Sequence, residues 1–530
     1  MPTIVITVGN AHPTVLFSSH VRNMVLMIER MKVYLFAEII PKNAPYLKQQ
    51  TLYSVELRLN IAENERKKTG PIMTSTRKSI HGQWSNRLVF ILAATGSAVG
   101  LGNIWKFPYI AGENGGGTFV LVYLVCIGLI GIPIMMAETM IGRRGRQSPI
   151  NTMVTLASEE SRSPGWVLLG AMGVVAGFLI LSYYSVIAGW ALSYVFRTGS
   201  GAFIGVTTDG VNSIFTNLVS DPEKLLAWHT IFMVMTMIIV ARGVKHGLEK
   251  AVRFLMPALL ALLLMTVAYS MTTGYFMEGV RFLFTPGEIS GQGVLIAMGH
   301  AFFTLSLGMG AIMVYGSYLP RHTSITQASV IIAIADTSVA LLAGMAIFPI
   351  VFANGLEPGA GPGLIFKTLP IAFGHMEAGT MIGTAFFILL VFAAWTSAIS
   401  LIEPAVAWLV ENRGMNRIYA AVYIGIFTWV LGIGSVLSFN LWADHTWSVP
   451  FLFEDKNFFD TLDFVTANLM LPLGGLFIAI FAAWLMRESS VRDELNTYDI
   501  VYRIWHFLVK YITPIAVIIV FLNVIGVIQL

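Results

Sequence analysis

Long apolar segments dominate this sequence, and each is long enough to cross a lipid bilayer as a helix. A bilayer core requires about 20 apolar helical residues, because no water is available there to satisfy backbone polar groups. Eleven segments qualify, at 88–112, 117–142, 166–196, 225–243, 251–273, 292–318, 325–353, 380–410, 417–438, 461–486 and 506–528. Only 12% of the 530 residues are charged and 56% are hydrophobic. These values exclude a soluble enzyme, a disordered chain and a nucleic-acid-binding protein, and they predict an all-α polytopic membrane protein.

Lysine and arginine are distributed unevenly between the loops, which predicts the orientation in the membrane. The loops after even-numbered segments hold about fourteen of these residues and the loops after odd-numbered segments about five, and loops rich in Lys and Arg stay in the cytoplasm. We therefore expect a cytoplasmic N-terminus and, because the segment count is odd, a C-terminus outside.

Residues 1–72 differ from the rest of the chain because they contain no apolar run long enough to span a membrane. The sequence MTSTRK, which begins at Met73, is typical of a cytoplasmic stretch just before a first membrane segment. We expect residues 1–72 to be an N-terminal extension that is disordered or lies upstream of the true initiator, Met73. A regulatory tail is the alternative.

Two of the apolar segments are interrupted by glycine and hydroxyl residues. The first contains GSAVGLGN at 96–103, and the sixth contains TLSLGMG at 304–310. Such residues weaken a helix and release backbone groups, which at mid-membrane must line a cavity or bind something. For one segment alone, close helix packing explains small residues equally well. Interruptions at corresponding positions of two halves, however, point to the binding site of a transporter.

The interrupted segments and two further motifs resemble the neurotransmitter:sodium symporter family. The four motifs are GSAVGLGNIWKFPYIAGENGGG at 96–117, GIPIMMAETMIGRRG at 131–145, FFTLSLGMG at 302–310 and AAWTS at 393–397. Eleven segments look like the bacterial branch, which implies the cell inner membrane. The resemblance implies a leucine-transporter-like domain at 73–530. It would consist of an inverted five-plus-five repeat (about 84–273 and 292–486), with helices 1 and 6 broken, and an extra helix at about 506–528.

The resemblance also implies two sodium sites. The first would take oxygens of Ala98, Asn103, Thr304 and Asp336, completed by the substrate carboxylate. The second would take the carbonyls of Gly96, Val99 and Ala393 and the hydroxyls of Thr396 and Ser397. Sodium is a hard cation and prefers such oxygen ligands. For Thr396 and Ser397 considered alone, hydroxyl bonds to the preceding helical turn are the alternative.

A zwitterionic substrate would lie between the two broken helices. Its carboxylate would meet the Leu101 and Gly102 N–H groups, at the positive end of a half-helix, and the Tyr184 hydroxyl. Its ammonium group would meet carbonyls of Ala98, Phe303 and Thr304 and the Ser306 hydroxyl, and Ser397 borders the same site. The side-chain pocket would be lined by Ser97, Ile180, Phe303, Met309 and Leu401. Because this lining carries no charge, we expect a hydrophobic L-amino acid, either aromatic or branched aliphatic.

Asp336 stands where chloride-dependent members of the family have an asparagine. An acid within a membrane segment is costly to bury and is therefore a functional candidate. Ala340, one turn later, offers neither of the side chains that other members use there. We expect Asp336 to supply the negative charge that chloride provides elsewhere, and hence transport without chloride. A structural acid with a partner nearby is the alternative.

The gates of the family can also be assigned by resemblance. The outer gate pair would be Lys106 and Asp463, the aromatic lid Tyr184 and Phe303, and the inner gate Trp84 with Glu411. His81 stands where relatives have the inner-gate arginine; Glu411 is its expected partner, and Arg77 or Lys78 are alternatives. Glu138 is expected to belong to a structural network, and Glu403 has no assigned role.

Together these expectations describe sodium-coupled symport of an amino acid into the cell by alternating access. A transceptor, which binds the amino acid without appreciable transport, is the alternative. A membrane enzyme using His300 with Ser306 or Asp336 is disfavoured, because the sequence contains no nucleophile elbow, zinc-spaced histidine pair or phosphate loop. The sequence leaves the oligomeric state open between monomer and dimer.

Overall fold

The structure, a computed structural model, describes residues 77, 79–358, 363–450, 452–524 and 527. The predicted extension 1–72, Met73 and Lys78 lie outside the described residues. The chain divides into two compact units, one of 1–77 with 161–163 and one of 78–160 with 164–530. All the helices and strands below belong to the second unit.

The first part of this unit is helical throughout. Its helices are α3 (Arg87–Ala98), α4 (Phe107–Glu113), α5 (Gly117–Cys126), α6 (Ile132–Gly145), α7 (Pro149–Glu159), α8 (Val167–Gly199), α9 (Thr208–Val219), α10 (Pro222–Ala241), α11 (Glu249–Ser270) and α12 (Phe276–Phe284). π-Helical turns at Gly102–Lys106, Ile127–Gly131 and Val244–Leu248 lead into α4, α6 and α11. Short 3-10 turns lie at Pro164–Trp166 and Met271–Thr273.

The second part is helical except for one hairpin. Its helices are α13 (Gly291–Thr304), α14 (Ala311–Ser317), α15 (Ile325–Ala353), α16 (Leu369–His375), α17 (Gly379–Arg413), α18 (Arg417–Leu437), α19 (Phe458–Asp463), α20 (Leu471–Ile480), α21 (Glu488–Leu495), α22 (Asp499–Phe507) and α23 (Thr513–Val524). The antiparallel strands β1 (Trp447–Val449) and β2 (Phe453–Lys456) pair Trp447 with Lys456. Further π-helical turns lie at Leu364–Thr368, Phe464–Met470, Phe481–Leu485 and Leu508–Ile512.

The membrane-spanning helices agree with the predicted fold class but not with the exact count. In the described residues, nine helical stretches are long and apolar enough to cross a membrane, and the bent pair Arg87–Ala98 and Gly102–Glu113 makes a tenth if it is counted as one span. The predicted segment 292–318 is divided between α13, with 14 residues, and α14, with 7 residues. Neither half reaches the required length alone, so the count of eleven stays a prediction.

Local sequence explains where several spans begin and end. The Ser324 side chain accepts a hydrogen bond from Gln327 N and caps α15, and Asp221 caps α10 in the same way, just before a proline at the first helical position. The long helix α17 ends at Arg413, and the next residue, Gly414, adopts the left-handed conformation that glycine tolerates.

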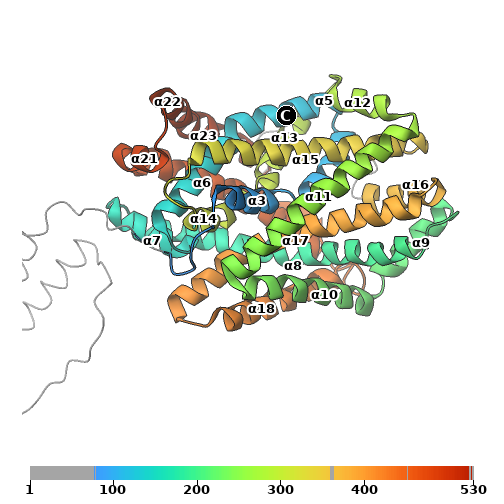
Figure 1. Ribbon diagram of the computed structural model, residues 1–530, viewed down its shortest axis with the longest axis horizontal. Coiled ribbons are helices and arrows are strands. Elements are labelled where there is room, and N and C mark those ends of the chain that lie inside the picture. Colours follow the sequence, from blue (N-terminus) through green and yellow to red (C-terminus); the bar gives the residue numbers. More distant parts are fainter. Residues whose placement is uncertain (1–76, 78, 359–362, 451, 525–526, 528–530) are drawn as a thin grey trace, which may run out of the picture. The chain divides into compact units, whose positions relative to one another are not determined.

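The broken first segment lies in the middle of the packed unit. Helix α3 contacts α11, α15 and α17, and α17 runs along α8 for much of its length (Figure 1). Helix α14 packs against α6. Both broken segments are therefore enclosed by long helices, which is the setting in which irregular backbone is tolerated at membrane depth.

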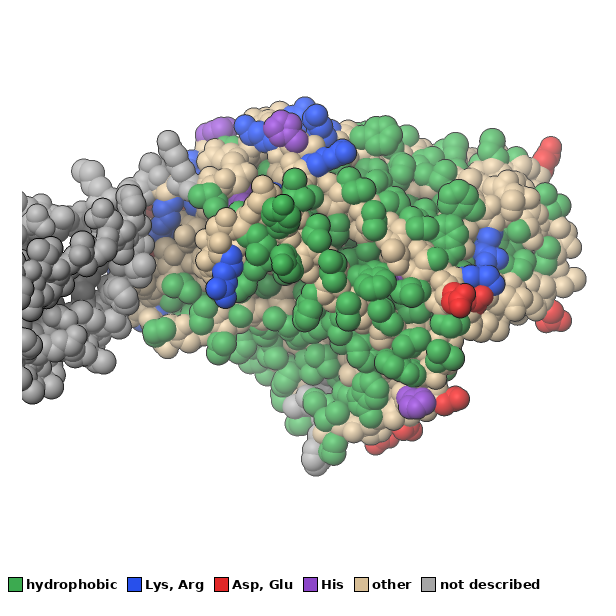
Figure 2. Space-filling model, turned by 90° about the horizontal axis from the view of Figure 1, so that it is seen from below, with side chains coloured by type: hydrophobic (Ala, Val, Ile, Leu, Met, Phe, Trp, Pro, Cys, Tyr) green, Lys and Arg blue, Asp and Glu red, His purple; other side chains and the backbone are tan. Residues whose placement is uncertain are grey.

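One face of the unit is covered mainly by apolar side chains. Figure 2 shows the side on which α10 and α18 lie in Figure 1, with few charged groups on it apart from those near its margins. Helix α18 exposes a run of large apolar side chains, which are Ile418, Tyr419, Val422, Tyr423, Ile426, Phe427 and Val430. Such a surface suits a lipid environment.

Candidate functional site

The two interrupted segments are unwound where the glycine clusters predict. Helix α3 ends at Ala98, and Val99 is extended, with φ −67° and ψ 107°. The two halves of this segment are bent by 51°. After Thr304, Gly308 and Gly310 have φ of +80° and +74°, which a side chain would strain. Ser306 also has positive φ, +54°, and its hydroxyl donates to Ser97 O at 2.8 Å, which joins the two unwound segments.

Glycines of neighbouring helices contact the second unwound segment through backbone alone. A Cβ added to Gly474 of α20 would lie 2.5 Å from Gly308 O, and one added to Gly173 of α8 would lie 3.0 Å from Gly310 N. Any larger residue at these positions would push the segment away, because closely packed interiors have no spare volume.

One cluster of polar side chains joins the first broken segment to α13 and α15. Asn103 Nδ2 donates to Asp336 Oδ1 at 2.8 Å and to Thr304 Oγ1 at 3.0 Å, and Thr304 Oγ1 donates to Asp336 Oδ2 at 3.0 Å. All three residues are buried. The expected use of the Asn103 amide oxygen requires a half-turn of this amide, because its oxygen accepts from Gly100 N at 3.0 Å. The structure thus brings these three predicted residues together around one carboxylate.

A second cluster joins the first unwound segment to α17. The Ser397 hydroxyl lies 3.4, 3.1 and 3.2 Å from the carbonyl oxygens of Gly96, Ser97 and Val99. Thr396 Oγ1 donates to Ala393 O at 3.0 Å. One hydroxyl proton serves only one of three converging carbonyls at a time, so this cluster holds more acceptors than donors. Such an excess of oxygen acceptors suits a hard cation.

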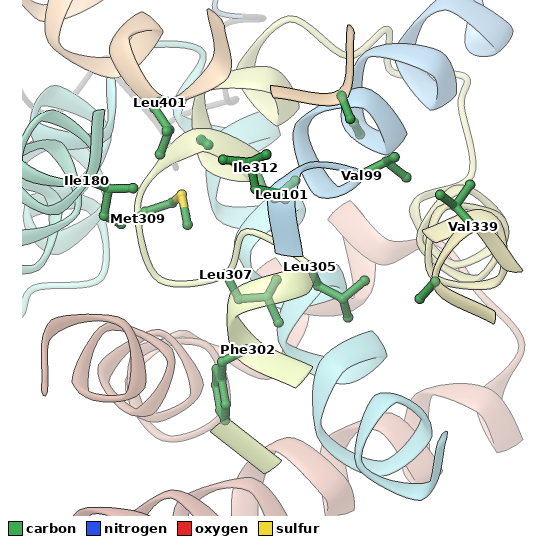
Figure 3. Close-up of a cluster of buried hydrophobic side chains, with 14 of the residues drawn as sticks. Val99, Leu101, Ile180, Phe302, Leu305, Leu307, Met309, Ile312, Val339 and Leu401 are labelled. Atoms are coloured by element: carbon green, nitrogen blue, oxygen red, sulfur yellow. The ribbon is translucent and has the colours of Figure 1, made fainter. Parts of the chain in front are cut away.

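A small cavity lies between the two unwound segments. It measures about 30 Å³ and is lined by Ser97, Ala98, Gly100, Gly102, Ile180, Tyr184, Phe303, Ser306, Met309, Ser397 and Leu401. All five residues predicted for the side-chain pocket are in this lining. Figure 3 shows Met309 next to Ile180, with Leu401 close to both. Because this volume holds no more than a few waters, an amino-acid side chain would have to displace the flexible thioether of Met309 or its neighbours.

Polar groups in the cavity wall are already bonded to one another. Leu101 N donates to Tyr184 Oη at 3.1 Å, so the two predicted carboxylate donors face each other. The Ser97 hydroxyl donates to Ser400 Oγ at 2.7 Å. Ser400 is a contact that the sequence analysis missed. It lies one turn after Thr396 on α17, and this helical spacing from a predicted site residue was the available signal.

A larger cavity, of about 450 Å³, lies on the other side of an aromatic layer. Tyr184 and Phe303, the predicted lid, line both cavities and separate them. Lys106 and Asp463 line the larger cavity, but among the described residues they form no ion pair with each other. Lys106 Nζ instead lies 4.8 Å from the centre of the Phe303 ring, and Asp463 accepts from Tyr183 Oη at 3.2 Å. The expected pair is not in contact because each side chain interacts with an aromatic neighbour instead.

The opposite side of the site is closed by the predicted inner residues. Trp84 is buried, its backbone N donates to Tyr318 O at 3.1 Å, and its Nε1 donates to Tyr315 O at 3.0 Å. His81 Nε2 lies 3.0 Å from Glu411 Oε1, as expected for the inner pair.

Glu403, to which the sequence alone assigns no role, lies on the same side of the site as Trp84 and Tyr318. Its carboxylate accepts from the Tyr318 hydroxyl at 2.8 Å and pairs with Arg417 of α18. A buried carboxylate requires such partners. The sequence alone does not reveal the pair, because the two residues lie on different helices.

Glu138 connects α6 to the second unwound segment. It is buried, and it accepts from Gly308 N at 3.1 Å and from Met313 N at 3.3 Å. These N–H groups lie where the helix is interrupted and therefore need acceptors from elsewhere. The predicted structural network thus contains a carboxylate that holds unwound backbone.

Substituting Glu138→Gln is expected to destabilise the protein. The amide keeps one acceptor oxygen, but its NH₂ group would face the other backbone N–H, and leaving that N–H unsatisfied costs about 1–3 kcal/mol. We expect a lower apparent unfolding temperature in a thermal scan of the detergent-solubilised protein. The exposed Glu278→Gln on α12 is the matched control and should leave it unchanged. An unaltered scan for Glu138→Gln would contradict this account.

The histidine considered for a membrane enzyme has a packing role in this fold. His300 is buried, stacks on Phe107 with ring centres 6.0 Å apart and lies 5.5 Å from Tyr123. No group of three or more His, Cys, Asp or Glu side chains in the described residues is arranged to hold a metal ion.

Comparisons with known proteins identify the family. The model of the sodium:neurotransmitter symporter family matches residues 81–203 and 215–529. The chain is 38% identical over 453 residues to the uncharacterized sodium-dependent transporter YhdH of Bacillus subtilis, covering 84% of this chain and 98% of that protein. It is 34% identical over 464 residues to an uncharacterized sodium-dependent transporter of Haemophilus influenzae, covering 85% and 99%. The crystal structure of MhsT in complex with L-phenylalanine superposes with a TM-score of 0.76 at 44% identity, covering 84% and 99%.

The family is one of sodium-coupled transporters rather than enzymes. The matched residues include both unwound segments, both polar clusters and the residues on either side of the cavity. The chain therefore belongs to the sodium:neurotransmitter symporter family.

Proposed function

We propose that this chain uses a sodium gradient to carry a hydrophobic L-amino acid into the cell by alternating access. The observation that carries the proposal is that two oxygen-rich clusters, around Asp336 and around Ser397, both contact the first broken segment, which also lines one small cavity. Both clusters and the cavity share the first unwound segment, so an ion at either cluster would affect the shape of the cavity. The solved relative MhsT was crystallised with L-phenylalanine, which supports an amino-acid substrate.

The oxygens available support a proposal of two sodium sites. The cluster at Asp336 offers a carboxylate, the Thr304 hydroxyl and, after a half-turn, the Asn103 amide oxygen. The cluster at Ser397 offers backbone carbonyls and two hydroxyls without a formal charge. Hard oxygen donors of this kind are the ligands that sodium prefers. A substrate carboxylate near the first site would be balanced by its ion, which gives a physical reason for reciprocal coupling of sodium and substrate.

The cavity lining supports a substrate with an uncharged side chain. No Lys, Arg, Asp or Glu belongs to the described lining, and Ile180, Met309 and Leu401 supply apolar surface. The N–H of Leu101 and the hydroxyl of Tyr184 would both bind the substrate carboxylate, and this contact would replace the hydrogen bond between them. A hydrophobic L-amino acid, aromatic or branched aliphatic, fits these groups.

The location in the cell follows from the charge distribution and the bacterial relatives. We propose the inner membrane, with the His81 side of the protein in the cytoplasm and the larger cavity facing outside. In this orientation the contact of Trp84 with Tyr318 closes the cytoplasmic side of the site. The larger cavity lies on the outer side of the Tyr184–Phe303 layer.

Uptake of labelled L-phenylalanine, L-tryptophan, L-tyrosine and L-leucine, each tested alone, examines the proposal. The purified chain is placed in proteoliposomes under an inward sodium gradient, with potassium liposomes as the control. Accumulation above the potassium level is expected for at least one of the four. Saturable binding without accumulation would instead indicate a transceptor, and neither binding nor uptake would refute the pocket assignment.

Chloride independence is a separate expectation. Asp336 places a covalently attached carboxyl group beside the proposed first sodium site, so no exchangeable anion is needed there. Replacing all chloride with gluconate is expected to leave the initial rate of sodium-driven uptake unchanged. A fall to the potassium background would show that chloride is required.

A further inference from the structure

Helix α21 crosses the corner at which α6 turns into α7, at one end of the helical unit (Figure 1). Glu494, in its last turn, pairs with Arg143 of α6, and these two side chains are only 9% and 4% exposed. At the other end of α21, Arg487 Nε lies 3.3 Å from Glu160 Oε2, just after α7, and Arg487 N donates to the same oxygen at 3.0 Å. This short helix therefore binds α6 at one end and α7 at the other.

Helix α6 is bonded to α14, which is the second half of a broken segment. Arg146, just after α6, donates from its guanidinium group to Ser317 O at 3.3 Å and to Leu319 O. Glu138 of α6 accepts from Met313 N of α14 at 3.3 Å. Both side chains are buried, and separating the two helices would leave these polar groups unsatisfied. We therefore expect α6 and α14 to move together.

Helix α7 is bonded to α17 instead. The Glu411 carboxylate of α17 accepts from Ser148 N at 2.8 Å, from Ser148 Oγ at 2.6 Å and from Asn151 Nδ2 at 2.7 Å. Helix α7 also packs against α8, and α8 packs along α17. We therefore expect α7 to stay with α8 and α17 when α6 and α14 move.

These two groups of helices must move relative to each other if the site opens alternately to the two sides. Helix α6 would then turn against α7 about the link at 146–148, where Arg146 has a positive φ of 60°. Because α21 is bound on both sides of this link, one of its two ends has to be released. The Arg487 end is the weaker one, since its side chain is 62% exposed and already solvated, whereas the Arg143–Glu494 pair is buried.

We propose that α21 is a brace across the corner between α6 and α7, which holds the inner side closed until Arg487 leaves Glu160. This inference rests on the proposed function, because it takes alternating access as the movement that opens the corner. The contact is formed while the inner side is closed, so it stabilises the closed state relative to the inward-open state. An ion pair with one exposed partner changes such an equilibrium by up to about fivefold.

The distance between two spin labels tests the brace in the full chain, in lipid nanodiscs without sodium or amino acid. Cys126 is the single cysteine, so in a Cys126→Ala background labels attach only where a cysteine is introduced. His322→Cys places one label in the exposed loop after α14, and Arg413→Cys places the other at the exposed end of α17. Pulsed electron–electron double resonance then gives the ratio of the inward-open to the closed population. Arg487→Gln is expected to raise this ratio about fivefold.

Arg492→Gln is the matched control on the same helix. Arg492 pairs with Glu488 of α21 and with Asp499 of α22, neither of which belongs to α6 or α7. The substitution removes the same charge from α21 without touching the corner, so the ratio of the two populations should stay at the wild-type value.

A second pair of variants separates the brace from a loss of stability. In Arg487→Gln the Arg144 side chain remains, 3.9 Å from Glu160 Oε1, so the buried carboxylate keeps a cation and the fold is retained. Glu160→Gln should also raise the open population, and combining it with Arg487→Gln should add little to either change alone, because both remove the same contact.

The outcomes distinguish the brace from the proposed function. Two label distances whose populations respond to sodium and amino acid but not to Arg487→Gln would overturn the brace alone, and so would an equal rise in Arg492→Gln. A single distance in every variant, with and without sodium and amino acid, would contradict alternating access and the brace together.

Discussion

Sodium affinity is expected to fall by about a thousandfold when Asp336 is replaced by asparagine. A unit charge about 4 Å from a cation contributes about 4 kcal/mol at an effective dielectric constant of 20, which corresponds to about three orders of magnitude in affinity. Asp336 is buried and holds both Thr304 and Asn103, so its charge is not replaced by water. The measurement is the sodium dependence of amino-acid binding by scintillation proximity.

Two further results decide how this effect is interpreted. The substitution retains the size of the side chain and one acceptor oxygen, and the Thr304 hydroxyl, unlike the backbone N–H groups at Glu138, can accept a hydrogen bond from the new NH₂ group. The unfolding temperature should therefore change little compared with the loss of sodium affinity. If chloride restores part of the affinity of Asp336→Asn, the carboxylate performs the role of an anion, as the resemblance to chloride-dependent members implies. Unchanged sodium dependence in Asp336→Asn would show that this cluster is structural and is not a sodium site.

The second large effect is expected from Gly100→Ala. A Cβ at Gly100 would lie 2.5 Å from Ser397 Oγ and 2.8 Å from Tyr184 Oη, which belong to a proposed sodium site and the proposed carboxylate site. Both side chains would have to move, and overpacking of this kind costs about 1–3 kcal/mol. We expect sodium-driven uptake to fall by about 5- to 150-fold, the factor that corresponds to this energy.

Gly299→Ala provides the comparison. Gly299 lies in α13, and a Cβ added there would have no atom within 4 Å. The same change of one methyl group in a helix of the second half should leave uptake close to wild type. If Gly100→Ala and Gly299→Ala behave alike, the small volume around Gly100 has no role in transport.

The sequence predicted a helix most accurately where the thickness of the bilayer core sets the length of one continuous segment. Residues 325–353 were predicted as one span, and α15 occupies Ile325–Ala353, because a serine cap and an asparagine bound a continuous apolar run. The two breaks were also visible, since glycine is costly inside a helix wherever the helix lies. The π-helical turns, such as Gly102–Lys106, were not predicted, because an extra residue in a turn leaves no mark on apolar periodicity.

Contacts between distant helices were predicted only where the family resemblance supplied them. His81 and Glu411 are 330 positions apart and were correctly expected to be partners. The pairing of Glu403 with Arg417 was missed, because nothing in one sequence states which helix faces which. The contact of Ser97 with Ser400 was missed although Ser400 lies one turn after the predicted Thr396. The position of the Lys106 side chain over the Phe303 ring could not be predicted from the sequence either, since it depends on whether the outer cavity is open.

The backbone contacts of Gly173 and Gly474 with the second unwound segment have a consequence for the entropy of movement. Side chains that interlock lose or exchange rotamers when one element slides past another, at a cost of up to about 2 kcal/mol for each long side chain. Glycine has no rotamers, so the segment at Gly308 and Gly310 moves against these two positions without that cost. At these contacts the segment is tightly packed at rest, and its displacement carries no penalty in side-chain conformational entropy.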